Sequence, residues 1–185
     1  MKPLILNRVC LRDFVAADRP YVYAGLSHPE VIKHYGISYD SLEATQAQMQ
    51  WFQDIVATKS GHWLAIEMLE TGQFVGAIGV SDRHLVHRCA ELGYWLLPDY
   101  WGQGLMAEAL QGFLGFAFGR LGLHNVHALV EVPNQASRQL LVRAGFTLEG
   151  IMRECEWKDD GYISLCRYAL LRHEFSGGAE VGSED

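Results

Sequence analysis

The sequence has 185 residues, of which 49% are hydrophobic and 20% charged, a composition typical of one soluble globular domain. Its formal net charge of −7 argues against a nucleic-acid-binding protein, because phosphate contacts require a basic face. No apolar run approaches the roughly 18 residues that span a bilayer, and the N-terminus is unlike a secretory signal. We therefore expect a cytoplasmic protein without membrane contact.

The last ten residues, 176–185, are rich in Gly and Ser and carry three carboxylates without any apolar period. This pattern is typical of a disordered acidic tail, so we expect one domain over residues 1–175. The four cysteines are scattered without a C-x-x-C pair, which favours reduced thiols over a disulfide framework.

The first half of the chain alternates between strand-like and helix-like patterns. Residues 4–14 alternate as a first strand does, and residues 17–36 have a helical pattern with a break near His28 and Pro29. Residues 41–60 show a clear spacing of three and four between apolar positions, which predicts a second helix with Ser41 as its N-cap.

Three consecutive strands are predicted next, over residues 62–69, 73–82 and 88–97. The Glu-Thr-Gly stretch at residues 70–72 is typical of a hairpin turn between the first two strands. Residues 105–121 are apolar nearly all round, which predicts a buried helix packed on a sheet.

The last part continues with a strand at residues 124–132 and a short helix at residues 134–145 that Gly145 ends. Residues 146–171 close the domain as strands around a turn at Asp160 and Gly161. The order β-αα-βββ-α-β-α-ββ predicts a mixed α/β (α+β) domain with one mainly antiparallel central sheet flanked by helices.

Two glycines, Gly102 and Gly104, stand where a predicted strand hands over to a predicted helix. At such a junction the free backbone N–H groups and the helix dipole favour an anion, and glycine lets the anion approach the amides. Ala107 stands where a G-x-G-x-x-G motif has its third glycine, and no lysine follows as in a P-loop. A tight turn without a ligand is an equal alternative for this pattern alone.

Three separate stretches of the chain resemble one known family, the GNAT superfamily of acyl-CoA-dependent N-acyltransferases. They are "AELGYWLLPDYWGQGLMAEAL", "VEVPNQASRQLLVRAGF" and "LEGIMRECEWKDDGYISLCRYAL". The likeness covers nearly the whole chain and is greatest to the Rim-type branch, which acetylates the N-termini of ribosomal proteins. It implies a GNAT fold, acetyl-CoA as co-substrate and possible homodimerisation.

The resemblance also implies a function: transfer of an acetyl group to a primary amine by direct attack in a ternary complex. The acceptor in this branch is the N-terminal α-amine of a ribosomal protein. Two alternatives stay open, a polyamine, aminoglycoside or other small amine as acceptor, and a catalytically silent domain that binds acyl-CoA or a partner protein.

The same resemblance assigns a binding role to the glycine loop and to the strand before it. The pantetheine arm would pair with the strand end at Leu96 and Leu97. Met106 is larger than the residue usual at its position, and either crowds the pyrophosphate or points into the core. The pyrophosphate would bind the backbone amides of Gly102, Gln103, Gly104, Leu105 and Met106.

Asn134 and Ser137 open the predicted helix at residues 134–145, where Asn is a good N-cap. The resemblance implies that Asn134 also contacts the pantetheine arm and that Ser137 protonates the departing thiolate. Leu141 occupies the place where many members of the superfamily have a tyrosine, and leucine cannot donate a proton.

Glu156 matches the carboxylate that serves as general base in the Rim-type branch. On a regular strand Glu154 and Glu156 would share a face, which would raise the pKa of one of them. Two solvated surface carboxylates are the alternative. Glu91, on the strand that leads to the glycine loop, is the second candidate for the base and could act through water.

Two H-x-x-H pairs occur, His84 with His87 and His124 with His127. They lie in predicted strands or loops, so they lack the helical spacing of a zinc-protease motif. No cysteine or carboxylate joins them at ligand spacing, and we expect no metal site.

Overall fold

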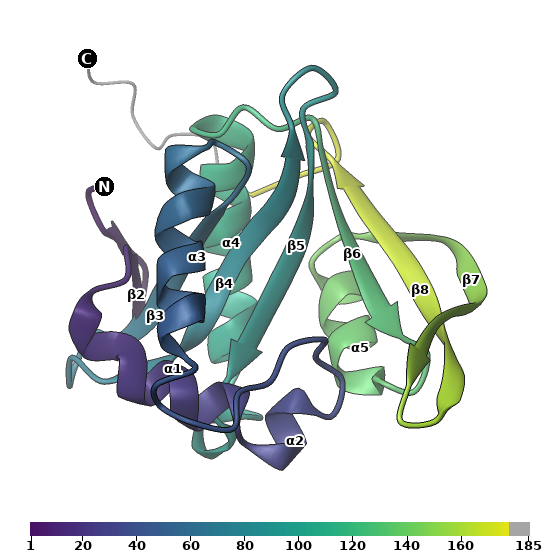
Figure 1. Ribbon diagram of the computed structural model, residues 1–185. Coiled ribbons are helices and arrows are strands. Elements are labelled where there is room, and N and C mark those ends of the chain that lie inside the picture. Colours follow the sequence, from purple (N-terminus) through teal and green to yellow (C-terminus); the bar gives the residue numbers. More distant parts are fainter. Residues whose placement is uncertain (178–185) are drawn as a thin grey trace.

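The computed structural model describes residues 1–177, which form one eight-stranded sheet in the order β1-β2-β3-β4-β5-β6-β8-β7 (Figure 1). The strands are β1 Leu4–Ile5, β2 Val9–Arg12, β3 His62–Met68, β4 Phe74–His84, β5 Cys89–Leu96, β6 Asn125–Glu131, β7 Thr147–Lys158 and β8 Gly161–Leu171. The helices are α1 Arg19–Leu26, α2 Pro29–Ile32, α3 Gln46–Ala57, α4 Leu105–Gly119 and α5 Gln135–Arg143, with 3₁₀ turns at Ala16–Asp18 and Pro98–Tyr100.

The helices cover the sheet from two sides. The apolar helix α4 packs with α5 on one face, over a core that draws residues from strands β2 to β6 and from β8. On the other face α1 and α3 pack on β3, β4 and β5 (Figure 1). On that same face, β6 and β8 carry polar residues such as His127, Glu131 and Arg167. The positions that alternate with them on each strand point to the opposite face and belong to the core beneath α4.

Strands β5 and β6 are the parallel pair of the sheet and are joined over three residue pairs, of which Glu91 with His127 is the last. Beyond that pair, β5 continues to Leu96 and β6 to Glu131 while the two strands diverge (Figure 1). The facing edges of both strands are therefore open along this stretch.

The predicted mixed, mainly antiparallel sheet flanked by helices is confirmed, and so are the three strands β3, β4 and β5 in their predicted order. Gly72 has a φ of +67° in the turn between β3 and β4, a conformation that glycine adopts without strain. The boundary at residue 175 stays a prediction. The ring of Phe175 packs on Phe118 of α4 with centroids 5.4 Å apart, while most of the predicted tail at residues 176–185 lies outside the described residues.

Three local predictions were wrong. Residues 4–14 form the hairpin β1–β2 rather than one strand, because the carboxylate of Glu108 accepts hydrogen bonds from the amides of Arg8 (2.6 Å) and Val9 (3.2 Å) and fixes a turn there. Ser41 caps a turn that precedes α3, since its Oγ accepts from the Ala44 amide at 3.1 Å. The last hairpin turns one residue earlier than predicted, at two aspartates with positive φ, Asp159 and Asp160.

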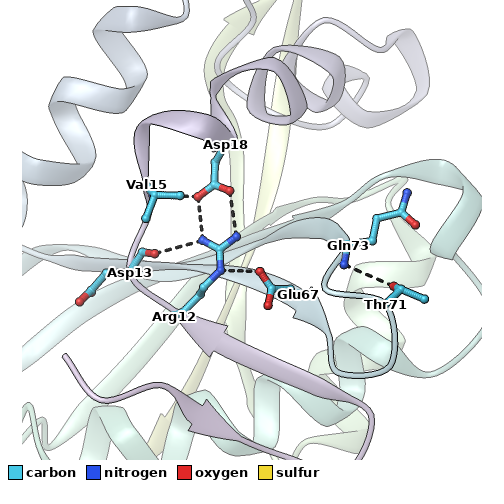
Figure 2. A network of polar contacts seen from close by, with 7 residues as sticks. All are labelled: Arg12, Asp13, Val15, Asp18, Glu67, Thr71 and Gln73. Carbon is cyan, nitrogen blue, oxygen red and sulfur yellow. Dashed lines mark hydrogen bonds and ion pairs between the residues drawn. The ribbon is translucent and has the colours of Figure 1, made fainter.

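A buried ion-pair network fixes the start of α1 on the sheet (Figure 2). The guanidinium of Arg12 on β2 donates to both carboxylate oxygens of Asp18, at 2.8 and 2.9 Å, and to Glu67 on β3 at 2.6 Å. Asp18 is 3% exposed, and its carboxylate also accepts from the Val15 amide at 2.9 Å. This bidentate geometry ties the 3₁₀ turn to two strands and so positions α1 over the sheet.

Candidate active site

The glycine loop before α4 has the conformation of an anion-binding site. Gly102 and Gly104 have φ of +70° and +75°, so both occupy the left-handed region, and Gly104 is the N-cap of α4. Within residues 1–177, the backbone amides of residues 102–107 donate to no hydrogen-bond partner. Six consecutive free N–H groups at the positive end of a 15-residue helix favour a phosphate group.

Neighbouring side chains hold the loop in place. The Arg8 guanidinium donates to the Gln103 carbonyl at 2.8 Å and to the Glu108 carboxylate at 2.9 Å. Trp101 donates from Nε1 to the Leu96 carbonyl at 2.8 Å and so connects the loop to the end of β5. The free amides are therefore presented by a loop that is fastened at both of its ends.

A cavity of about 930 Å³ runs from this loop to the start of α5 and to the segment around α2. Its wall contains seven of the predicted residues: Leu96, Gly102, Gly104, Leu105, Met106, Asn134 and Ser137. Met106, in the first turn of α4, is 9% exposed and belongs to the hydrophobic core as well as to the cavity wall.

Four predicted residues lie outside the cavity wall: Leu97, Gln103, Glu91 and Glu156. The backbone of Leu97 is already in use, because its N–H donates to Val75 on β4 and its carbonyl accepts from the Tyr100 amide. Pairing of Leu97 with a pantetheine arm is therefore not supported by its contacts. The amide of Gln103 stays among the free N–H groups, although its side chain binds the Asp99 carbonyl.

The start of α5 brings Asn134 and Ser137 to the cavity. Asn134 is the N-cap of α5, and its Oδ1 accepts from the Ser137 amide at 3.2 Å. The Ser137 hydroxyl lies 2.7 Å from the hydroxyl of Tyr94 on β5, and Tyr94 also lines the cavity. Leu141, one turn further along α5, is fully buried in the core.

Burial raises the pKa of Tyr94 to about 12, although its hydrogen bond with Ser137 acts in the opposite direction. The phenol is therefore protonated at neutral pH. Sequence reasoning missed Tyr94 as a functional residue. The sequence pattern could have indicated where its side chain points. Tyr94 is a polar residue between Leu92 and Leu96, on the alternating positions of β5 that face the core beneath α4.

The charge of one predicted base, Glu156 on β7, acts on the other, Glu91 on β5. Burial raises the pKa of Glu91, and the charges of Asp82 and Glu156 raise it further. Glu156 is exposed and ends an irregular stretch of β7 that begins at Met152 and contains Glu154 with a φ of +49°. Because this bulge interrupts the alternation, the predicted shared face of Glu154 and Glu156 does not follow from the strand geometry.

A second polar cluster, also missed from the sequence, lies beside α2, where its member His34 lines the cavity. Glu131 at the end of β6 accepts from His34 Nδ1 at 2.6 Å and from Lys158 Nζ at 2.5 Å. Lys158 also donates to the Lys33 carbonyl at 2.6 Å. Burial would raise the pKa of Glu131, but the hydrogen bonds from Lys158 and His34 outweigh it and lower the pKa. The cluster joins the segment after α2 to β6 and to the β7–β8 hairpin.

Within residues 1–177, no group of three or more His, Cys, Asp or Glu side chains is placed to hold a metal ion. The rings of His84 and His87 stack with centroids 4.1 Å apart at the β4–β5 turn. None of the described helices has the length and the apolar character that crossing a membrane requires.

Comparison with known proteins gives the chain its relatives. A family model described as the acetyltransferase (GNAT) domain matches residues 8–147. The uncharacterized N-acetyltransferase YoaA of Bacillus subtilis strain 168 is 32% identical over 167 residues, which cover 90% of this chain and 94% of that protein. The ribosomal-protein-serine acetyltransferase of Escherichia coli K12 is 24% identical over 161 residues, or 87% of this chain and 85% of that protein.

Two further matches extend the comparison. The spermidine N(1)-acetyltransferase of Escherichia coli K12 is 24% identical over 104 residues, which cover 56% of each chain. The solved structure of RimL, a ribosomal L7/L12 alpha-N-protein acetyltransferase in complex with coenzyme A, matches with a TM-score of 0.84 at 21% identity. The match covers 92% of this chain and 98% of the RimL chain, and at 21% identity it shows that the two proteins share a fold.

Proposed function

The chain belongs to the GNAT acetyltransferase family, and we propose that it acetylates the N-terminal α-amine of a protein, in its natural setting a ribosomal protein. The reaction is direct attack of the amine in a ternary complex with acetyl-CoA. The observation that carries the proposal is the cavity lined by the end of β5, by the loop with the free amides before α4, and by the start of α5 with Ser137.

The residues of the cavity fit a coenzyme A thioester. Such a molecule has a pyrophosphate, a long amide-rich arm and a reactive end. The free amides of residues 102–107 suit the pyrophosphate. The edge of β5 beyond Glu91 suits the amides of the arm, although the Leu96 carbonyl already accepts from Trp101 Nε1. Arg143 also lines the cavity and suits a further phosphate. Acetyl-CoA would supply the activated acetyl group.

Ser137 in the cavity wall and two carboxylates outside that wall, Glu156 and Glu91, supply proton transfer. Ser137 is held by the capped start of α5, and its Oγ gives a proton to the departing thiolate. Glu156 takes the proton of the attacking amine, with Glu91 as the second candidate for this role. The raised pKa of Glu91 suits a base that works near neutral pH.

Two observations support an α-amine as acceptor. One relative is named a ribosomal-protein-serine acetyltransferase and matches most of this chain. An α-amine has an ordinary pKa of about 8, against about 10.4 for lysine, so it needs little help to lose its proton. The carboxylates of Asp82, Glu91 and Glu156 would also attract a cationic acceptor.

A polyamine is the second candidate, because the same carboxylates suit a cation and one relative is named a spermidine acetyltransferase. A cytoplasmic location and a homodimer stay predictions. Gel filtration with light scattering would decide the oligomeric state.

The first experiment is a calorimetric titration of the full chain with acetyl-CoA and with dephospho-CoA. We expect a dissociation constant on the order of micromolar for acetyl-CoA. No binding by a folded sample would overturn the proposal and favour the silent domain. Weaker binding of dephospho-CoA would point to a contact with the 3′-phosphate, which Arg143→Gln should remove.

The second experiment identifies the acceptor by mass spectrometry. Matched basic peptides carry a free N-terminus, or a blocked N-terminus with one free lysine, and spermidine is the third acceptor. Acetylation of the free N-terminus alone is the expected result. Acetylation of spermidine alone would show that the acceptor is a polyamine and not a protein α-amine, and the proposed mechanism of acetyl transfer would still hold.

A further inference from the structure

The hydroxyls of Tyr94 and Ser137 form a polar pair that joins the two walls of the cavity. Tyr94 comes from β5 and Ser137 from the first turn of α5, and their oxygens lie 2.7 Å apart. Within residues 1–177, neither hydroxyl has another hydrogen-bond partner. Both residues line the cavity, so the pair lies where a thioester arm would end.

The direction of this hydrogen bond decides what Ser137 can do. A hydroxyl has one proton and two acceptor lone pairs, so only one oxygen of the pair donates to the other. If Tyr94 donates, the Ser137 proton is free to point into the cavity. At 2.7 Å either hydroxyl can donate, since both carry their proton at neutral pH. The phenol is the more acidic of the two hydroxyls and therefore the stronger donor, so the donor role is assigned to Tyr94.

We propose that Tyr94 and Ser137 form a two-proton relay in which Tyr94 supplies a proton to Ser137 as Ser137 protonates the departing thiolate. The carbon–sulfur bond breaks and its electron pair stays on sulfur. Ser137 Oγ transfers its proton to that sulfur, and the Tyr94 proton moves to Ser137 Oγ. The phenolate left on Tyr94 regains a proton from solvent after the products leave. Ser137 thus avoids becoming an alkoxide, which is far more basic than a phenolate.

The relay rests on the proposed function only in its chemistry, the acetylation of an amine by direct attack. Its tests use whichever acceptor the wild-type chain acetylates, so a wrong acceptor would not affect them. Tyr94→Phe removes the phenol oxygen and keeps the ring. Tyr168→Phe is a matched control, because the Tyr168 hydroxyl on β8 also bonds a residue of α5, Arg138 Nε at 3.2 Å, and lies outside this cavity.

Steady-state kinetics form the first test. Ser137→Ala should lower kcat by about 100-fold, the lower end of the usual range for proton transfer. Tyr94→Phe should lower kcat by about 10- to 100-fold, because Ser137 keeps its own proton. The double variant should be no slower than Ser137→Ala, since Tyr94 acts only through Ser137. Effects that multiply, or an equal loss in Tyr168→Phe, would overturn the relay.

Binding of product gives a readout that does not depend on turnover. At about pH 9.5, where a thiol is largely ionised, wild type should bind CoA about tenfold more tightly than desulfo-CoA, because a hydrogen bond to a charged sulfur is strong. Ser137→Ala should abolish this preference, Tyr94→Phe should reduce it, and Tyr168→Phe should keep it. An unchanged preference in Tyr94→Phe would show that the phenol does not act on Ser137.

Discussion

Alanine at Gly104 tests whether the loop before α4 depends on the backbone freedom of glycine. Gly104 is the N-cap of α4 and has a φ of +75°. An added Cβ would meet the Arg8 guanidinium at 3.5 Å, which is an ordinary contact, so steric clash contributes little. The cost of the substitution therefore comes from the left-handed backbone itself.

The size of that cost follows from two opposing effects. A left-handed conformation costs a residue with a Cβ about 1–2 kcal/mol, while replacing glycine stabilises by about 0.4–1 kcal/mol through the unfolded chain. Gly104→Ala should thus lower the free energy of unfolding by about 1 kcal/mol, or about 2–4 °C in Tm for a chain of this length. Gly115→Ala is the matched control, since Gly115 lies inside α4 with nothing within 4 Å of an added Cβ.

The control should change stability in the opposite direction. Alanine is favoured over glycine by about 1 kcal/mol inside a helix, so Gly115→Ala should raise Tm by about 2–4 °C. Thermal and urea unfolding of the ligand-free chain measure both variants. Calorimetry should show acetyl-CoA affinity reduced about tenfold in Gly104→Ala alone, because its Cβ would stand beside the free amides. Tm shifts of the same sign, together with equal acetyl-CoA affinities in the two variants, would show that the loop does not depend on glycine at position 104.

Three further substitutions test other parts of the molecule. Arg12→Met leaves the buried Asp18 carboxylate unpaired and should lower the free energy of unfolding by about 3 kcal/mol in urea; an unchanged midpoint would contradict this. Burial by itself would raise the pKa of Glu108, but the hydrogen bonds from Arg8 outweigh burial, so the net pKa is lowered. The ionised carboxylate therefore stabilises the folded chain at pH values above its ordinary pKa of 4.5, and this stabilisation is lost as the pH falls through the lowered pKa. Glu108→Gln should therefore destabilise the chain at about pH 7 and much less at about pH 3, and an equal loss at both would argue against the charge. Glu156→Gln should lower kcat about 100-fold and leave acetyl-CoA affinity within about twofold; unchanged turnover would remove Glu156 as the base.

The sequence predicts those parts of the fold that depend on local patterns. Strands β3, β4 and β5 follow from short, largely apolar runs and from a glycine in a short turn. The β1–β2 hairpin does not, because the carboxylate that fixes its turn lies on Glu108, 100 positions after Arg8. The bulge in β7 likewise depends on pairing with β8, where two irregularities in register occur.

In the candidate site, too, some residues could be predicted from local sequence patterns and others could not. Gly102, Gly104 and the Asn134 cap have local signatures, so the sequence alone locates the start and the far end of the cavity. The partner of Ser137 lies 43 positions earlier on another strand, and the contact of His34 with Glu131 spans 97 positions. Side-chain pairs of this kind arise from tertiary packing, so the spacing of residues along the sequence does not predict them.

The site combines free backbone groups with the side chains that line the cavity. Strand β5 pairs with β6 over three residues and then leaves its edge open, while β4 and β8 occupy the outer edges of the two strands. The loop after β5 adds six free amides in front of α4. An elongated ligand with a phosphate at one end and amides along its length meets matching groups throughout. The side chains add Arg143 for a further phosphate and, where protons move, Ser137 with its hydrogen-bond partner Tyr94.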